Sequence, residues 1–74
     1  MRLDDKEGIN EAFEYHAPNE EQRKLYNELR PKFKQLALDI LELVPASATR
    51  TVALRKLWEC SMTCNAAIAT EGKI

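Results

Sequence analysis

The sequence contains few of the residue types that build metal centres and acid–base sites. Its 74 residues include one histidine and two cysteines, and Cys60 and Cys64 lie four positions apart. A disulfide between neighbours on one helix would constrain nothing, and a zinc site would need about two further ligands. We therefore predict no metal and no cofactor, and we interpret both cysteines as small buried apolar residues. With a single histidine, His16, and no base placed beside either thiol, we predict that the protein is not an enzyme.

Neither sign of charge dominates the chain, and long apolar runs are missing. The formal net charge is −1, so the pronounced basic surface that duplex nucleic acid requires is absent. Asp39 and Glu42 interrupt the longest apolar runs, which are too short to span a membrane. No stretch has the pattern of a secretory signal. We expect a soluble, cytoplasmic protein with neither duplex nucleic acid nor a membrane as partner, and any anionic ligand must be small and bound locally.

A first long helix is predicted over about residues 19–44. Asn19, followed by two glutamates and Gln22, has the pattern of a capped N-terminus. The apolar residues then recur every three or four positions, as a helix that packs on a partner requires: Tyr26, Leu29, Phe33, Leu36, Ile40 and Leu43. Pro31 removes one hydrogen bond from this helix. We expect a kink there, because the period continues past it, and a division into two helices is the alternative.

A second long helix is predicted over about residues 47–70, and its segment Leu54–Ala69 organises the rest of the chain. Ser47 is placed to cap its first turn, and Gly72 follows its last periodic residue, where glycine favours a left-handed stop. The inner face of this helix carries small side chains where most helices carry large ones. Such a helix cannot fill a core alone, so another element must supply the bulk.

The N-terminal segment predicts a short helix over about residues 5–14, with a cap at Asp4 and Phe13 as its anchor. Tyr15 and His16 follow at a corner, because Pro18 favours extended backbone just before the first long helix. Tyr15 either covers this corner or meets a ligand. His16 either bonds to backbone or takes part in the same site.

The turn Val44–Ser47 is short enough to make the two long helices antiparallel neighbours. The fold class is thus all-α: one domain over residues 1–74, an antiparallel hairpin of two long helices with a short N-terminal helix. The first long helix is apolar over more of its circumference than one partner can cover, and one hairpin has too small a core. We therefore predict a homo-oligomer.

Charge is unevenly distributed along the predicted hairpin. Near the turn, Asp39 and Glu42 are expected close to Arg50 and Arg55. At the far end, Cys60–Thr70 has no ionised side chain, while the facing part of the first long helix carries Arg23, Lys24, Arg30, Lys32 and Lys34. Arg30 and Lys34 share one helix face by their spacing. These cations form either a solvated basic surface or a pocket for a small anion.

The sequence resembles the hairpin domain of phage anti-CBASS and anti-Thoeris sponges. The resemblance covers about residues 15–69, and its last motif is the most specific. The motifs are Tyr15-His16-x-Pro18, Leu29-Arg30, Leu36-Ala37 with Ile40, Pro45-x-Ser47, Ala53-Leu54-x-x-Leu57-x-Glu59 and Met62-x-x-Asn65-Ala66-Ala67-Ile68-Ala69.

The resemblance implies a phage protein, acting in the cytoplasm of an infected bacterium, that assembles as a hexamer and sequesters cyclic oligonucleotide immune signals without cleaving them. It implies that Tyr15 stacks on a base and that Arg30 reaches a phosphate, with Asn65 as a further ligand residue. Cyclic dinucleotides are the expected ligands, and trinucleotides are a second class. The candidate ligand-binding residues are Tyr15, His16, Arg30, Lys34, Asn65 and Thr70.

The sequence departs from the family pattern in three places. Thr63-Cys64 replaces the usual Trp-Ala, and Thr49 replaces an acidic residue after the turn. Thr70 stands where an arginine is usual, and that arginine is a candidate phosphate ligand of a separate trinucleotide site. The alternative function is a helical inhibitor or adaptor module that offers its broad apolar face to a host protein.

Overall fold

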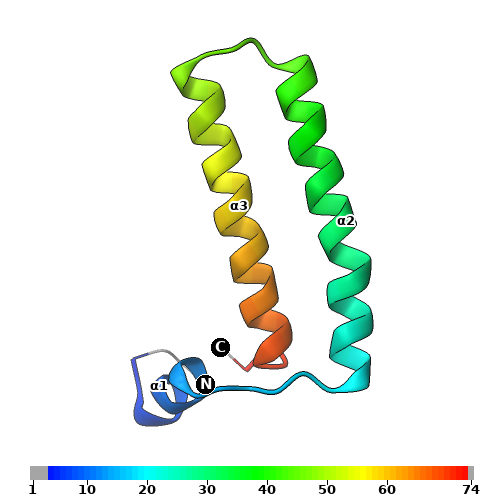
Figure 1. Cartoon of the computed structure of the whole chain (residues 1–74). Coiled ribbons are helices and arrows are strands. Elements are labelled where there is room, and N and C mark those ends of the chain that lie inside the picture. Colours follow the sequence, from blue (N-terminus) through cyan, green and yellow to red (C-terminus); the bar gives the residue numbers. More distant parts are fainter. Residues whose placement is uncertain (1–3, 74) are drawn as a thin grey trace.

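The computed structural model describes residues 4–73, which form three helices and no strand. Helix α1 spans Lys6–Phe13, α2 spans Glu20–Leu43 and α3 spans Ala48–Ala69. Figure 1 shows α2 and α3 running antiparallel beside each other, with α1 lying next to the end of α3 that is distant from the turn. The predicted all-α hairpin with a short N-terminal helix is therefore confirmed.

Polar side chains cap the start of each helix. Asn19 and Gln22 form a capping box: the Asn19 side chain accepts from the Gln22 amide at 2.8 Å, and the Gln22 side chain accepts from the Asn19 amide at 2.9 Å. The Ser47 hydroxyl accepts from the Arg50 amide at 3.0 Å. The prediction of a cap at Asp4 was wrong by one position. Asp5 caps α1 and accepts from the Gly8 amide at 2.6 Å.

Helix α3 ends one residue earlier than a stop at Gly72 would require. Glu71 already has a positive φ of 54°, and Gly72 follows with a φ of 73°. The Gly72 amide bonds the Ala67 carbonyl at 2.9 Å, and the Glu71 amide bonds the Ile68 carbonyl at 3.1 Å. This pair of bonds is a Schellman motif, in which the left-handed position is usually glycine. Here a glutamate adopts it, and the glycine extends the left-handed turn.

Helix α2 continues through Pro31, so the alternative of two separate helices is wrong.

At the C-terminal end of α2, the Arg50 guanidinium of α3 donates to the carbonyls of Leu41 at 3.2 Å and Val44 at 3.3 Å. Arg50 thus binds the C-terminal carbonyls of α2, which lack partners within the helix. The nearby Asp39 carboxylate accepts from the Gln35 amide group at 2.9 Å rather than from an arginine.

The hairpin has no fully buried apolar side chain within residues 4–73. Its buried polar residues are Gln22, near the start of α2, and Thr70, at the end of α3, so both lie at the end of the hairpin away from the turn. Phe13 is 81% exposed, so it does not anchor α1 as predicted. Cys60 is exposed and Cys64 half-buried, so the prediction of two buried cysteines was also wrong for the single chain.

No helix within residues 4–73 combines the length and the apolar character needed to cross a lipid bilayer.

Candidate functional site

A groove of about 280 Å³ lies between the two long helices, near the middle of the hairpin. Helix α2 contributes one wall and α3 the other, so the antiparallel packing of the hairpin creates the groove. Its lining residues are Arg30, Phe33, Lys34, Ala37, Leu54, Leu57, Trp58, Ser61 and Asn65. The lining thus combines apolar side chains with two cations, a serine and an asparagine.

Two unpaired cations define the electrostatics of this groove. No carboxylate lines it, and neither Arg30 nor Lys34 has an ion pair within residues 4–73. Two other cations of α2 do have ion pairs: Arg23 lies 3.9 Å from the Glu20 carboxylate, and Lys32 lies 3.6 Å from the Glu28 carboxylate. The groove therefore combines two positive charges with partly apolar walls, which suits a small anion that has an apolar part.

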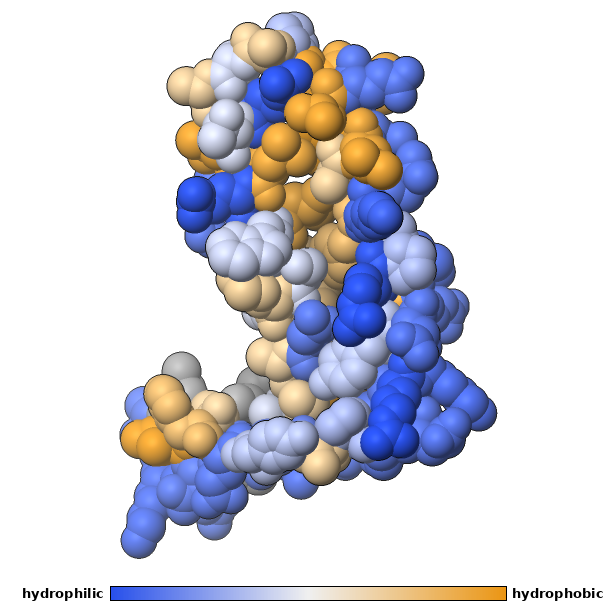
Figure 2. All heavy atoms as spheres, in the orientation of Figure 1, coloured by the Kyte–Doolittle hydropathy of each residue, from blue (hydrophilic) through white to orange (hydrophobic). Residues whose placement is uncertain are grey.

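Two other grooves are lined by α2 and by the C-terminal end of α3, and both contain carboxylates. The larger, of about 610 Å³, includes Glu21 and Glu71, and the smaller, of about 290 Å³, includes Glu28 with Lys32. Leu25 and Ile68 line both. These acidic groups repel phosphate, so the groove of Arg30 and Lys34 is the better anion site. Figure 2 shows apolar side chains gathered at the turn end of the hairpin and hydrophilic ones along the part of α2 away from the turn.

Asn65 and Trp58 stand on the α3 wall. The Tyr26 hydroxyl donates to the Asn65 backbone carbonyl at 3.3 Å, which ties the helices together and leaves the Asn65 side-chain amide available. The Ser61 hydroxyl donates to the Trp58 carbonyl at 2.6 Å. Trp58 is 58% exposed in the groove. The sequence analysis did not predict Trp58 as a site residue, because a tryptophan in an apolar helix pattern usually indicates packing. Its spacing of three and seven residues from Ser61 and Asn65 could have indicated that it shares a helix face with them.

Tyr15 lies outside the groove. It occupies the connection between α1 and α2 and is 83% exposed, with its ring on none of the groove walls. The resemblance assigns Tyr15 to a base and Arg30 to a phosphate. Within one chain, however, these two side chains do not line the same cavity.

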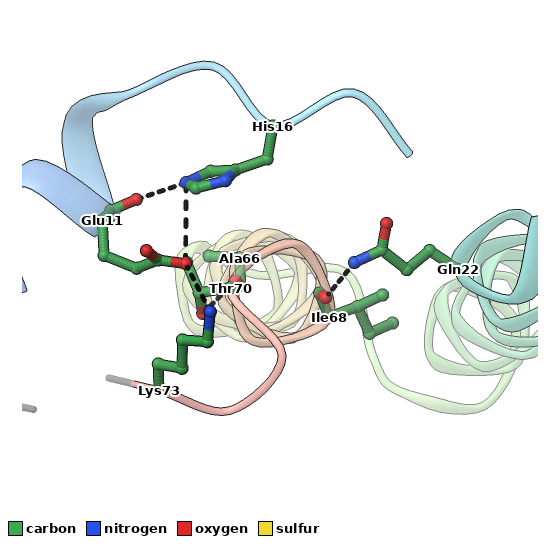
Figure 3. A network of polar contacts seen from close by, with 7 residues as sticks. All are labelled: Glu11, His16, Gln22, Ala66, Ile68, Thr70 and Lys73. Carbon is green, nitrogen blue, oxygen red and sulfur yellow. Dashed lines mark hydrogen bonds and ion pairs between the residues drawn. The ribbon is translucent and has the colours of Figure 1, made fainter. Parts of the chain in front are cut away.

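His16 and Thr70 belong to a polar network where α1 meets the end of α3 (Figure 3). His16 Nε2 contacts the Glu11 carbonyl and lies 3.9 Å from the Glu11 carboxylate, which Lys73 Nζ approaches to 3.8 Å. The buried Thr70 hydroxyl donates to the Ala66 carbonyl at 2.8 Å. The Thr70 hydroxyl thus bonds within α3, and the Glu11–Lys73 ion pair joins the N-terminal segment to the residues that follow α3.

Gln22 connects this network to α2. Its side-chain amide donates to the Ile68 carbonyl at 3.0 Å, while its amide oxygen accepts from the backbone of Asn19 (Figure 3). One buried glutamine therefore caps α2 and fixes the end of α3 against it.

The environment of Cys64 lowers the reactivity of its thiol. Partial desolvation raises the pKa of the Cys64 thiol, and the neighbouring Cys60 raises it further through its charge and a hydrogen bond. A raised pKa keeps the thiol protonated at neutral pH, where it is a poor nucleophile and a poor metal ligand. Within residues 4–73, no group of three or more histidine, cysteine or acidic residues is placed to hold a metal ion.

Of the six predicted ligand residues, the structure brings Arg30, Lys34 and Asn65 into one groove. Comparison with known proteins gives one family: residues 5–69 match the family described as Acb2/Tad1, hairpin domain. No curated protein and no solved structure gives a significant match.

Proposed function

Because the chain belongs to the Acb2/Tad1 hairpin-domain family, we propose that it binds cyclic oligonucleotide immune signals and sequesters them without cleaving them. The family is known for cyclic nucleotide sponges and is a binding family rather than an enzymatic one. In this proposal the protein is encoded by a phage and acts in the cytoplasm of the infected bacterium, where it withdraws the signal from the host receptor.

The observation that carries the proposal is the pair of unpaired cations in a carboxylate-free groove. Arg30 and Lys34 lie four residues apart on one face of α2, so both can approach one phosphate or two neighbouring phosphates. A cyclic dinucleotide carries two phosphates in a compact ring with flat bases, and the apolar groove walls suit the bases. Asn65 adds an amide that can donate to or accept from a base or a ribose.

Assembly is part of the proposed mechanism. Tyr15 does not line the groove of its own chain, yet its ring is 83% exposed and free to stack on a base. In a homo-oligomer, proposed here as a hexamer, Tyr15 of one copy can meet a ligand held by Arg30 of another. The large exposed apolar side chains of α2 and α3 provide the surface for such assembly: Leu25, Leu36, Leu38, Leu41, Leu43, Val52 and Met62.

Calorimetric titration with cyclic di-GMP, cyclic GMP–AMP and cyclic tri-AMP tests this function. We expect saturable binding of at least one dinucleotide, with recovery of the intact ligand after the protein is denatured. Absence of binding by every cyclic nucleotide would reject the sponge, and recovery of a linear product would reject sequestration without cleavage.

A protein-binding adaptor is the second candidate, and the exposed leucines near the turn favour it. Leu41 is 50% exposed and Leu43 is 78% exposed. An adaptor would use this apolar end and leave the cationic groove on open surface. Binding of a cyclic dinucleotide that Arg30→Ala weakens would favour the sponge; unimpaired binding of a host protein by the same variant would favour the adaptor.

A further inference from the structure

Trp58 is the single tryptophan of the chain, and it stands in the cationic groove. It projects from α3, whereas Arg30 and Lys34 belong to the facing helix α2. The indole is 58% exposed, so packing of the hairpin does not account for it. Exposing so large an apolar side chain is unfavourable unless something covers it.

The residues around Trp58 leave its ring accessible from the groove. Ser61 and Asn65 follow on the same face of α3 at spacings of three and four, and both are smaller than the apolar residues usual at such positions. The Ser61 hydroxyl is turned back to the Trp58 carbonyl at 2.6 Å. A flat aromatic group entering the groove therefore meets the indole on one side and the two cations on the other.

We propose that Trp58 is a base-stacking residue of the ligand site, with one nucleobase on its indole and the attached phosphate on Arg30 and Lys34. This assignment rests on the proposed function and names a binding residue that the family resemblance does not supply. Indole presents the largest aromatic face among the side chains, and stacking on it tolerates any base because every base has a π face.

The size of the groove sets how much of the ligand it can hold. Its volume of about 280 Å³ lies below the roughly 300–1,000 Å³ typical of sites for drug-sized molecules. The groove thus accommodates one nucleotide unit rather than a whole cyclic dinucleotide. The second base remains outside, where an exposed aromatic side chain such as Tyr15 can stack on it. Trp58 and Tyr15 then hold different bases of one ligand.

The fluorescence of the protein gives a direct test, because tryptophan emission comes from Trp58 alone. We expect cyclic GMP–AMP to quench this emission in the wild type in step with the heat of binding. Trp58→Ala should weaken binding by about five- to a hundredfold, whereas Trp58→Phe, which keeps an aromatic face, should restore most of the affinity. Thr63→Ala is the control: Thr63 is an exposed residue of α3 outside the groove and outside the apolar surface, so its truncation should leave affinity unchanged.

The outcomes separate this assignment from the proposed function. Heat of binding without any change in tryptophan emission, and with equal affinity in Trp58→Ala, would overturn the stacking role while the sponge stands. No heat with any cyclic nucleotide would overturn both. A lower oligomeric mass for Trp58→Ala in light scattering, with Trp58→Phe equally impaired, would assign the indole to subunit contact and overturn the proposal. The wild-type fluorescence decides the matter even if Trp58→Ala fails to fold.

Discussion

At the scale of single residues, the environment of a side chain decides its role more than its chemical type does. Arg23 and Arg30 stand on the same helix, yet Arg23 lies near a glutamate and Arg30 faces a groove without one. Likewise Tyr26 bonds the backbone of α3, while Tyr15 has its ring in solvent. The sequence located the cations but could not show which of them lacked a partner, since that depends on rotamers and on the facing helix.

We expect Arg30→Ala to weaken cyclic dinucleotide binding by about 1.5–3 kcal/mol, because it removes a charged hydrogen bond to phosphate in a partly apolar groove. Arg55→Ala is the matched control, since it removes the same side chain from an exposed position outside the groove. Calorimetry at fixed ionic strength measures both. Equal losses in the two variants would mean that only the net charge of the protein matters.

Replacing Tyr15 by Ala should cost about 1–3 kcal/mol of binding, the range for stacking of a base on an aromatic ring. Phe13→Ala provides the comparison, because Phe13 is similarly exposed at 81% and lies nearby on α1. Oligomeric mass should be unchanged in both variants. If Phe13→Ala weakens binding as much as Tyr15→Ala does, the effect belongs to the N-terminal segment as a whole and not to the tyrosine ring.

The two thiols should differ in reactivity. The pKa of Cys64 is raised, so less of this thiol is ionised at a given pH, and Cys64 is also less exposed than Cys60. Brief alkylation of the wild-type protein by iodoacetamide near neutral pH, followed by peptide mass spectrometry, should therefore modify Cys64 more slowly than Cys60. Equal rates would show that the environment of Cys64 does not suppress its thiolate.

At the scale of helices, the sequence predicted more than it did at the scale of residues, because caps and periodicity are local. Asn19 and Ser47 cap the long helices as expected. At α1, two consecutive aspartates offered two caps, and only the backbone conformation selects Asp5. The groove itself arises where α2 and α3 face each other. The hairpin register predicted that Arg30 and Lys34 face the end of α3, but Trp58 was missed because its pattern matches that of a packed residue.

Replacing Asn19, which caps α2, should destabilise the protein more than replacing Asn27, which lies inside α2. Asn19→Ala removes one half of the capping box and should lower the free energy of unfolding by about 0.5–2 kcal/mol. Asn27→Ala, at an exposed position inside the helix, should change it by less than about 0.5 kcal/mol. Urea unfolding at one protein concentration compares them. Equal stability of the two variants would mean that the start of α2 is held by other contacts, such as that of Gln22 with Ile68.

At the scale of the whole molecule, an isolated chain has little with which to stabilise itself. Residues 4–73 bury no apolar side chain fully, and the interior contacts of the hairpin involve half-buried residues such as Leu29, Phe33 and Leu57. A chain of this length gains only about 3–5 kcal/mol from a good single core. Periodicity could predict the excess apolar surface but not what covers it, because that depends on the shape of the whole surface.

Thr70 stands where the resemblance implies an arginine, and this sets an expectation for ligand choice. The Thr70 hydroxyl is buried and donates to the Ala66 carbonyl, so it offers nothing to a phosphate. Cyclic dinucleotides should therefore bind more tightly than cyclic tri-AMP in competitive calorimetry. Thr70→Arg, which introduces a phosphate ligand at that position, should improve trinucleotide binding if the variant folds, with Thr63→Arg as a control for added charge. Tight binding of cyclic tri-AMP by the wild type would contradict this expectation.

Assembly should govern both stability and binding. Light scattering at low micromolar concentration should give a mass several times the 8.5 kDa of one chain. Leu38 is 49% exposed in the single chain, so Leu38→Glu would leave an isolated hairpin nearly unaffected but would place a charge in an apolar subunit contact. We therefore expect Leu38→Glu to lower the mass, to reduce stability in proportion to the loss of assembly and to weaken cyclic dinucleotide binding. Asn27→Glu adds the same charge at an exposed polar position of α2 and should preserve the mass. A folded wild-type monomer that binds ligand with full affinity would refute the assembled site.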